Sequence, residues 1–264
     1  MTFNGIRGVP DFICDEYTPR QTKYCLLIPI VNENGRIQKE LEHAKETGIN
    51  KLVDIVICDG GSTDGCTNAE ALKELGVNTL LTKTGKGKQG AQLRMGFWWT
   101  LQRGYEGFVT IDGNNKDSIE DIPAFIEKLD SGYDFIQGSR FVKGGRAINT
   151  PIMRWIAVNF IHAPIISITA RKRFTDTTNA YRAYSKKYIM HPNVQPFRDI
   201  FITYELLAYL SVKASQLGLR VCEIPVTRMY PKSERTPTKI KGFHGNSLLL
   251  RILFENARGK YDVR

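Results

Sequence analysis

The sequence has few cysteines, and their spacing does not suit a disulfide framework or a zinc site. It contains five cysteines, an odd and widely spaced set without a C-x-x-C pair. Disulfide-stabilised folds and zinc sites need paired cysteines at regular spacing, so both structures are disfavoured. Buried or idle thiols fit a reducing compartment. We therefore expect a cytoplasmic protein.

The sequence also lacks repeats, low-complexity tracts and a signal-peptide pattern at its N-terminus. Its most apolar stretch, residues 151–170, is interrupted by Arg154, Asn159, His162 and Pro164. A membrane-spanning helix needs about 20 nearly uncharged residues, so this stretch is a poor candidate for one. We expect two short helices there, either packed in the core or lying at a membrane interface.

Negative charge is scarce in the second half of the chain. Residues 1–150 hold 18 Lys/Arg and 20 Asp/Glu, a net charge of −2, whereas residues 151–264 hold 19 Lys/Arg and 7 Asp/Glu, a net charge of +12. An evenly solvated surface would not divide its charge in this way. The second half is therefore expected to face phosphates, as in a nucleoside diphosphate, a lipid phosphate, an anionic membrane or nucleic acid.

What the sequence does contain is an alternation of short apolar runs and amphipathic stretches. Strands are predicted at residues 24–31, 53–58, 77–81, 108–111 and 134–137, and helices at 35–48, 68–75, 89–103 and 119–129. The first 22 residues show no periodicity and are predicted to form an arm. The alternation predicts an α/β domain, in which helices cover both faces of a mostly parallel sheet.

Polar, glycine-rich segments follow all of the predicted strands. They are Pro29-Ile-Val-Asn-Glu33, Asp59-Gly-Gly-Ser-Thr-Asp-Gly65, Gly85-Lys-Gly-Lys-Gln-Gly90, Thr110-Ile-Asp-Gly-Asn-Asn-Lys-Asp117 and Gly138-Ser-Arg-Phe-Val-Lys-Gly-Gly145. Ligands bind at the carboxyl ends of strands in parallel sheets. An aspartate there can accept hydrogen bonds from a nucleoside or hold a cation against a diphosphate, and an arginine can bind phosphate. Any one segment could be a plain turn, but the set indicates a binding site.

The third segment matches G-x-G-x-x-G and lies between a strand and a helix, as in dinucleotide-binding folds. It follows the third strand, however, and Lys86 and Lys88 stand where a pyrophosphate would approach the helix. A nicotinamide-dependent enzyme is therefore the least favoured alternative.

The five segments, in this order, resemble the motifs of the family 2 inverting glycosyltransferases. Within that family the chain most resembles the dolichol- and polyprenyl-phosphate mannosyl or glucosyl synthases. Later motifs that carry the resemblance are Asp176-Thr-Thr-Asn-Ala-Tyr-Arg182, Glu205-Leu206 and Glu223-Ile-Pro-Val226. The resemblance implies a single GT-A domain over residues 23–264. Residues 23–140 would form its nucleotide-sugar-binding half and residues 141–264 its basic, acceptor-side half.

The resemblance also implies a donor site for a nucleoside-diphosphate sugar, either a GDP-sugar or a UDP-sugar. Its candidate residues are Pro29, Val31, Asn32, Glu33, Asp59, Gly60, Ser62, Lys86, Gly87, Asp112, Gly113, Asn114, Lys116, Arg228, Arg235 and Lys239. Asp59 would contact the nucleoside, and the region of Asp112 would hold metal and diphosphate. The reaction would be one inverting displacement at the anomeric carbon. Arg140 and the later basic residues would help to stabilise the negative charge of the leaving diphosphate.

The metal motif departs from the family. The family usually has Asp-x-Asp where this chain has Asp112-Gly113-Asn114, and these synthases commonly carry a glutamine at the position of Lys116. The asparagine lacks a full charge, and one charge pair ~4 Å apart at an effective dielectric of ~20 contributes about 4 kcal/mol before desolvation. We therefore expect Mg²⁺ or Mn²⁺ to bind weakly at Asp112 and Asn114. Lys116 could instead neutralise the diphosphate directly.

The chemistry of the acceptor decides whether a general base is needed. A polyprenyl phosphate is already an anion and needs none, whereas a sugar hydroxyl must lose a proton, and Asp176 is the candidate base. The leading prediction is transfer to a polyprenyl phosphate at the inner face of the membrane, with no nucleic-acid partner. The alternatives are transfer to a glycan hydroxyl in surface-polysaccharide assembly, and a sugar-nucleotide-binding protein that has lost catalysis.

Overall fold

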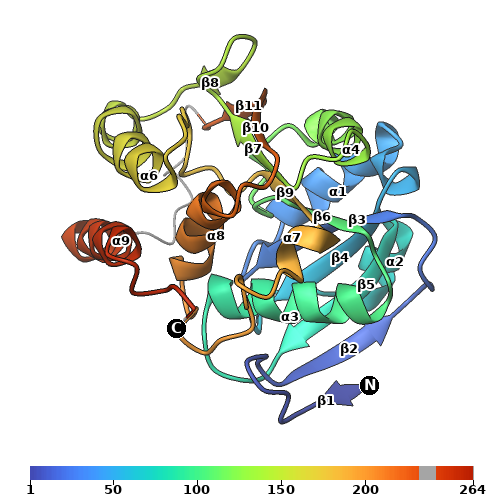
Figure 1. Ribbon diagram of the computed structural model, residues 1–264. Helices are drawn as coiled ribbons and strands as arrows, with labels where there is room; N and C mark the ends of the chain where they lie inside the picture. The colour runs from blue at the N-terminus through green and yellow to red at the C-terminus, as the bar shows by residue number, and fades with distance from the viewer. Residues whose placement is uncertain (232–241, 264) are drawn as a thin grey trace.

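The computed structural model describes residues 1–231 and 242–263. Among them, nine strands form one sheet in the order β1-β2-β5-β4-β3-β6-β9-β7-β10 (Figure 1). These strands are β1 (Thr2–Phe3), β2 (Phe12–Glu16), β3 (Tyr24–Ile30), β4 (Asp54–Asp59), β5 (Val77–Lys83), β6 (Gly107–Thr110), β7 (Phe135–Ser139), β9 (Arg182–Ser185) and β10 (Val221–Pro225). β8 (Arg146–Ile148) and β11 (Thr227–Met229) form a separate parallel pair.

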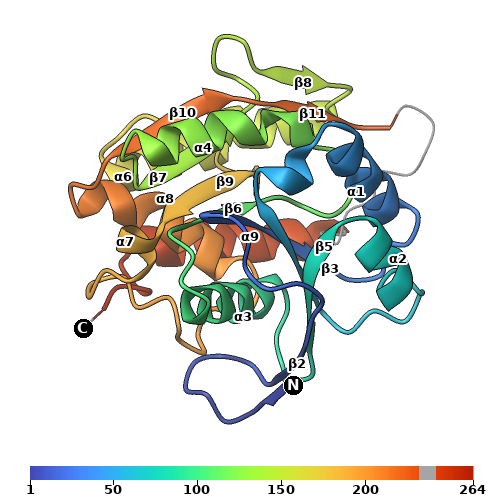
Figure 2. The same ribbon diagram turned by 90° about the vertical axis from the view of Figure 1, so that its right-hand side faces the viewer.

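The centre of the sheet is the predicted parallel core. β5, β4, β3 and β6 run parallel, and all residues of β4 are buried. Such strands are mostly apolar because helices cover both of their faces. One face is covered by α3 (Gln89–Gln102) and α8 (Glu205–Gln216), and the other by α1 (Arg36–Glu46), α2 (Ala69–Glu74) and α4 (Ile122–Asp130) (Figure 2). The short helical segments are η1 (Ile49–Lys51), η2 (Ile119–Asp121) and α7 (Lys186–Ile189).

β9 interrupts the parallel order, since it runs antiparallel to both β6 and β7. It begins with Arg182, a buried charge in a strand of four residues. The guanidinium donates to the carbonyl oxygens of Asn179, Leu207 and Thr177 at 2.7–2.9 Å. These three hydrogen bonds compensate for the burial of the charge, so the strand is stable although its sequence is not apolar.

The first 22 residues contain β1 and β2 and are part of the sheet, rather than the predicted arm without regular structure. β2 pairs antiparallel with β5 and buries Phe12 and Cys14 on one face. The Phe12 ring stacks on Phe3 with centroids 4.8 Å apart. Five residues with two buried positions make a pattern too short to recognise in the sequence.

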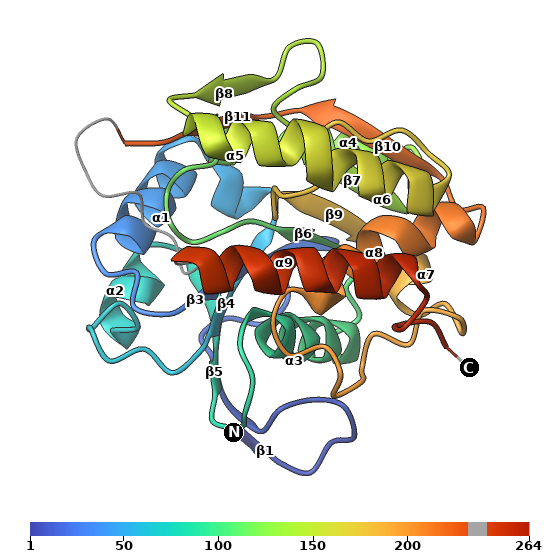
Figure 3. The ribbon, with the colours of Figure 1, turned by 90° about the vertical axis from the view of Figure 1, so that its left-hand side faces the viewer.

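Residues 152–170 form one continuous helical segment instead of the two predicted short helices. It comprises α5 (Ile152–Ala157), a π-helical turn (Val158–His162) and α6 (Ala163–Ala170). The wider turn directly precedes Pro164, and such turns adapt a helix where a normal hydrogen bond is lost. Among the described residues, this is the one helix whose length and composition would suffice to cross a membrane, and 17% of it is buried. Its α6 part packs against α8 and α9 (Gly242–Ala257), as Figure 3 shows.

Phe12→Ala is expected to lower the free energy of unfolding by about 3–5 kcal/mol, because the ring is fully buried against Phe3 and Trp98. Urea denaturation measures the change. The matched control is Ile13→Ala on the exposed face of the same strand, which should cost less than about 1 kcal/mol. Equal small losses for the two variants would show that β2 is not part of the cooperative unit.

Candidate active site

The donor-site candidates of the first two segments lie together at the carboxyl ends of β3 and β4. Asp59 organises the turn after β4: its carboxylate accepts the N–H of Gly61 at 2.9 Å and both the N–H and hydroxyl of Ser62 at 3.0 and 2.5 Å. The N–H of Asn32, in the loop after β3, donates to the Ser62 hydroxyl oxygen at 2.9 Å. Asp59 is buried. Its buried carboxylate therefore fixes the shape of the turn that is predicted to receive the nucleoside.

Gln92 of α3 clamps the same two strand ends from below. Its Nε2 donates to the carbonyl oxygens of Ile30 and Cys58, both at 2.7 Å. Gly60 is needed above the clamp because a Cβ there would collide with the Val31 side chain. The two loops are therefore held in one arrangement by this side chain and by the hydrogen bond between Asn32 and Ser62.

The glycine-rich segment after β5 is packed tightly against the chain itself. Gly87 has a φ of +111°, and a Cβ there would lie 2.5 Å from that of Ala91. A Cβ on Gly90 would lie 2.7 Å from the Phe201 carbonyl oxygen. These glycines serve internal packing, which removes the main reason to expect a dinucleotide here. Lys86 is exposed beside them.

The centre of the site is an ion-pair network around Arg228 of β11. The chain after β6 runs beside β11, where the Met229 N–H donates to the Lys116 carbonyl oxygen at 2.7 Å. This pairing places the buried Arg228 guanidinium between two carboxylates. Its Nη2 donates to Asp112 Oδ2 at 3.0 Å, and its Nη1 donates to Asp117 Oδ2. Asp117 was not among the predicted site residues.

The two carboxylates respond differently to burial. Burial raises the pKa of Asp117 to about 6, although Arg228 acts to lower it. Burial also acts to raise the pKa of Asp112, but the charges of Arg228 and Lys116 outweigh it and hold this pKa below its ordinary value. The pKa of Arg228 is raised, since the two carboxylates overcome the effect of its burial. Asp112 is therefore an ionised carboxylate that protein cations already stabilise.

Several positively charged side chains, all from the part of the chain that the structure describes, lie around the ring of Tyr230. The Lys116 Nζ lies 5.3 Å from the ring centroid, and the guanidinium carbons of Arg154 and Arg228 lie 5.8 Å from it. The Arg140 Nη1 lies 3.4 Å from the Tyr230 hydroxyl oxygen. Burial and the like charges of Arg228 and Arg154 lower the pKa of Lys116 to about 8. We call these five residues the Tyr230 cluster; it concentrates positive charge where an anion could bind.

Arg140 and Asp176, the predicted catalytic residues, form a buried ion pair. The Arg140 Nε donates to Asp176 Oδ2 at 2.6 Å and its Nη2 donates to Oδ1 at 2.9 Å. Their side chains are 1% and 0% exposed. In this arrangement Asp176 cannot reach the hydroxyl of an acceptor, and the guanidinium fork of Arg140 is directed at Asp176 rather than at a ligand. The catalytic roles of the two residues stay predictions; in this structure Asp176 positions Arg140 beside Tyr230.

Arg154 and Tyr230 contact this network but are not among the residues predicted from the sequence. Arg154 stands in the apolar stretch 151–170, where the sequence indicates only an interruption. A lone arginine in such a stretch indicates a specific contact, because a charge retained beside apolar residues needs a partner. Arg235 and Lys239 lie outside the described residues.

The residues around Asp112 do not fit a divalent cation. Oδ2 accepts Arg228, and Oδ1 accepts Gln89 Nε2 at 3.3 Å. The Asn114 Oδ1 is a buried acceptor that makes no hydrogen bond. It could supply one neutral ligand to a metal ion. Among the described residues, His, Cys, Asp and Glu side chains form no group of three or more that could hold a metal ion. A metal ion would have to displace the guanidinium or the Gln89 amide from Asp112, and it would approach the Lys116 ammonium.

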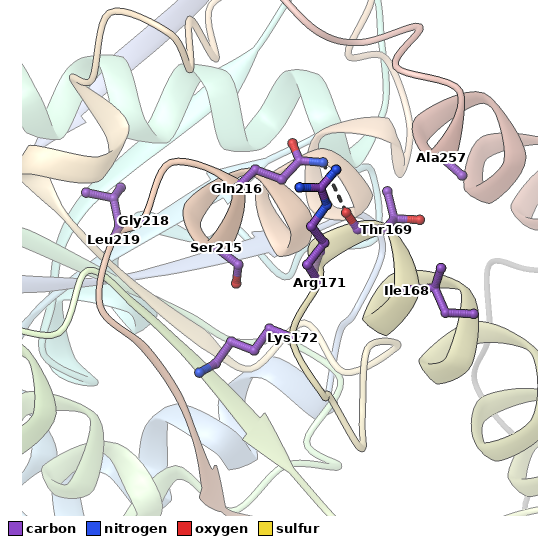
Figure 4. Close-up of a pocket in the computed structure, with 10 residues that line it drawn as sticks. Ile168, Thr169, Arg171, Lys172, Ser215, Gln216, Gly218, Leu219 and Ala257 are labelled. Carbon is purple, nitrogen blue, oxygen red and sulfur yellow. Dashed lines mark hydrogen bonds between the residues drawn. The ribbon is translucent and has the colours of Figure 1, made fainter.

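A surface hollow lies elsewhere, at the ends of α6 and α8. It has a volume of about 870 Å³ and is lined by Arg171, Lys172 and Gln216 among others (Figure 4). The Gln216 Nε2 donates to the Thr169 carbonyl oxygen at 3.1 Å. The exposed Ile168 adjoins these basic residues. The hollow is therefore a basic and partly apolar surface, separate from the strand-end site.

Comparison with known proteins identifies the family. The family described as Glycosyl transferase family 2 matches residues 25–198. The chain belongs to this family. It is 26% identical to the polyprenol monophosphomannose synthase of Mycolicibacterium smegmatis, over 94% of this chain and 92% of that protein. It is 27% identical to the undecaprenyl-phosphate mannosyltransferase of Micrococcus luteus, over 82% of this chain and 86% of that protein.

A solved structure supports the fold. The glucosyl-3-phosphoglycerate synthase of Mycobacterium tuberculosis, in complex with Mn²⁺, UDP and phosphoglyceric acid, matches with a TM-score of 0.63. The match covers 89% of this chain and 78% of that chain at 12% identity. The predicted GT-A fold and the predicted glycosyltransferase family are both confirmed.

Asp176→Ala is expected to lower the free energy of unfolding by about 3–5 kcal/mol, because Arg140 would remain buried without its counter-charge. Denaturant unfolding measures the loss. An Arg140→Met/Asp176→Leu variant removes both charges and should recover much of it. If Asp176→Ala keeps wild-type stability but loses sugar transfer, Asp176 is a catalytic residue after all.

Proposed function

We propose that this family 2 glycosyltransferase transfers a sugar from a nucleoside-diphosphate sugar to a polyprenyl phosphate at the membrane surface. The observation that carries the proposal is the position of Arg154, which belongs both to the Tyr230 cluster and to the exposed apolar helix. Its neighbours Met153 and Trp155 are 72% and 43% exposed. A lipid phosphate has the matching parts, an anionic headgroup joined to an apolar chain.

Two further observations favour a phosphate over a sugar hydroxyl as the acceptor. The candidate base, Asp176, is enclosed in its ion pair with Arg140, whereas a phosphate acceptor needs no base. The names of the two relatives describe mannosyl transfer with polyprenol or undecaprenyl phosphate. The glycan-hydroxyl acceptor is therefore the second candidate, and the binding protein without catalysis is the third.

The donor is proposed to lie across the ends of β3, β4 and β6. The turn ordered by Asp59 would receive the nucleoside of a GDP- or UDP-sugar, and Lys116 and Arg228 would face its diphosphate. An acceptor phosphate oxygen held near Arg154 would attack the anomeric carbon as the bond to the diphosphate oxygen breaks. The electron pair of that bond leaves with the nucleoside diphosphate. Fixed cations stabilise this developing charge without reorganisation.

The proposed location is the inner face of the membrane, where the α5–α6 segment would lie in the interface. Phe160 is 67% exposed, and its ring packs edge-on against Trp155 with centroids 5.8 Å apart. The basic residues at 171–173 follow directly after α6. Each basic residue near an anionic surface contributes about 1 kcal/mol, so apolar insertion and charge would act together.

Arg154→Ala is expected to reduce kcat/KM for undecaprenyl phosphate by roughly 10–100-fold, the loss of one charge-assisted hydrogen bond. The KM for the sugar nucleotide should change little. Steady-state transfer from radiolabelled GDP- and UDP-sugars measures both values, with the exposed Arg146→Ala as the matched control. Unchanged kcat/KM for the lipid phosphate would remove Arg154 from the acceptor site.

A Trp155→Ala/Phe160→Ala variant is expected to bind anionic vesicles at least tenfold more weakly, since each buried aromatic side chain contributes about 1.5–3 kcal/mol. Sedimentation with phosphatidylglycerol vesicles measures binding, which should also fall as salt rises. Leu52→Ala changes a comparably exposed apolar residue in the donor half and should have no effect. Wild-type protein that stays in the supernatant at low salt would contradict the membrane location.

A further inference from the structure

We infer that Lys116 and Arg228 take the place of the divalent cation, so that this enzyme binds the diphosphate of its donor without a metal ion. The inference rests on the proposed donor site. It concerns the end of β6, where Asp112, Asn114 and Lys116 occupy alternate positions of one short loop.

The carboxylate that would hold the metal is engaged by protein donors. Arg228 donates to one Asp112 oxygen at 3.0 Å and Gln89 to the other at 3.3 Å. The guanidinium is itself held on its far side, because Nη1 donates to Asp117 and, at 3.2 Å, to Asn179 Oδ1. A metal ion at Asp112 would compete with these donors and would find one partly exposed carboxylate, whereas Mg²⁺ demands near-ideal oxygen ligation.

The charges at this loop oppose a metal ion and favour a diphosphate. Lys116 and Arg228 both face the Tyr230 ring, at 5.3 and 5.8 Å from its centroid. A divalent cation at Asp112 would meet these two like charges, but a diphosphate would meet two opposite ones. Asn114 adds a neutral acceptor, which suits a hydroxyl group of the donor sugar better than a divalent ion.

The backbone holds Lys116 in place before any ligand binds. Asn115, at a φ of +53°, donates its N–H to Glu40 Oε2 at 2.9 Å, and the Lys116 carbonyl oxygen accepts Met229. Asparagine tolerates this left-handed conformation. The backbone is therefore fixed by the fold, and the side chain is buried beside Tyr230, so little ordering of this cation is needed when the donor arrives.

Calorimetric titration of GDP and UDP tests the inference, because it needs no acceptor. We expect the preferred nucleotide to bind the wild-type protein equally well in EDTA and in Mn²⁺. Lys116→Gln should bind it about tenfold or more weakly in EDTA. Asn114→Asp/Lys116→Gln restores the usual motif and should bind Mn²⁺ in titrations with the metal alone, which the wild type should not. The exposed Lys51→Gln is the matched control.

Three results would overturn the inference: tighter nucleotide binding by the wild type in Mn²⁺ by about tenfold or more, unchanged affinity of Lys116→Gln in EDTA, or no binding of GDP or UDP in either condition. Failure of the proposed acceptor would look different. Nucleotide would then bind without metal as expected, while transfer to undecaprenyl phosphate would be absent.

Discussion

The ion pairs of Arg228 with Asp112 and Asp117 connect the two halves of this molecule. Residues 1–140 contribute the carboxylates at the end of β6, and the later part of the chain contributes the guanidinium from β11. Arg228 and Asp117 are buried, so removing one of these two would leave an uncompensated buried charge, at a cost of about 3–5 kcal/mol. The position of Lys116, and with it the Tyr230 cluster, depends on the same junction because the Lys116 backbone pairs with β11.

The excess of basic residues after residue 150 is used at two separate places. Arg154 and Arg228 face Tyr230 inside the site, whereas Arg171 and Lys172 line the hollow at the end of α6. Buried cations act through short, directed contacts that salt screens little, whereas exposed cations act on a surface and are screened. The basic residues counted together in the sequence therefore act in two ways: some through short contacts inside the fold, and others as exposed charges on its surface.

The sequence predicted the parallel core because β3 and β4 each contain a run of apolar residues and are followed by polar, glycine-rich segments. It did not predict β2, whose five residues are too few for a pattern, or the continuous helix over 152–170, where Arg154 and Pro164 suggested a break. The predicted roles of Arg140 and Asp176 came from motif chemistry, which could not show that the two side chains form a buried ion pair with each other. The pairing of Arg228 with Asp112 joins positions 116 residues apart, which no local pattern encodes.

The loops after β3 and β4 cannot open independently of each other. The Gln92 amide holds the carbonyl oxygens of Ile30 and Cys58 together, and the Gly60 N–H also donates to the Ile30 carbonyl oxygen at 2.8 Å. The two loops therefore form one rigid unit on the helix that begins at the glycine-rich segment. If the donor binds there as proposed, a movement that releases the spent nucleotide would have to come from other segments of the site.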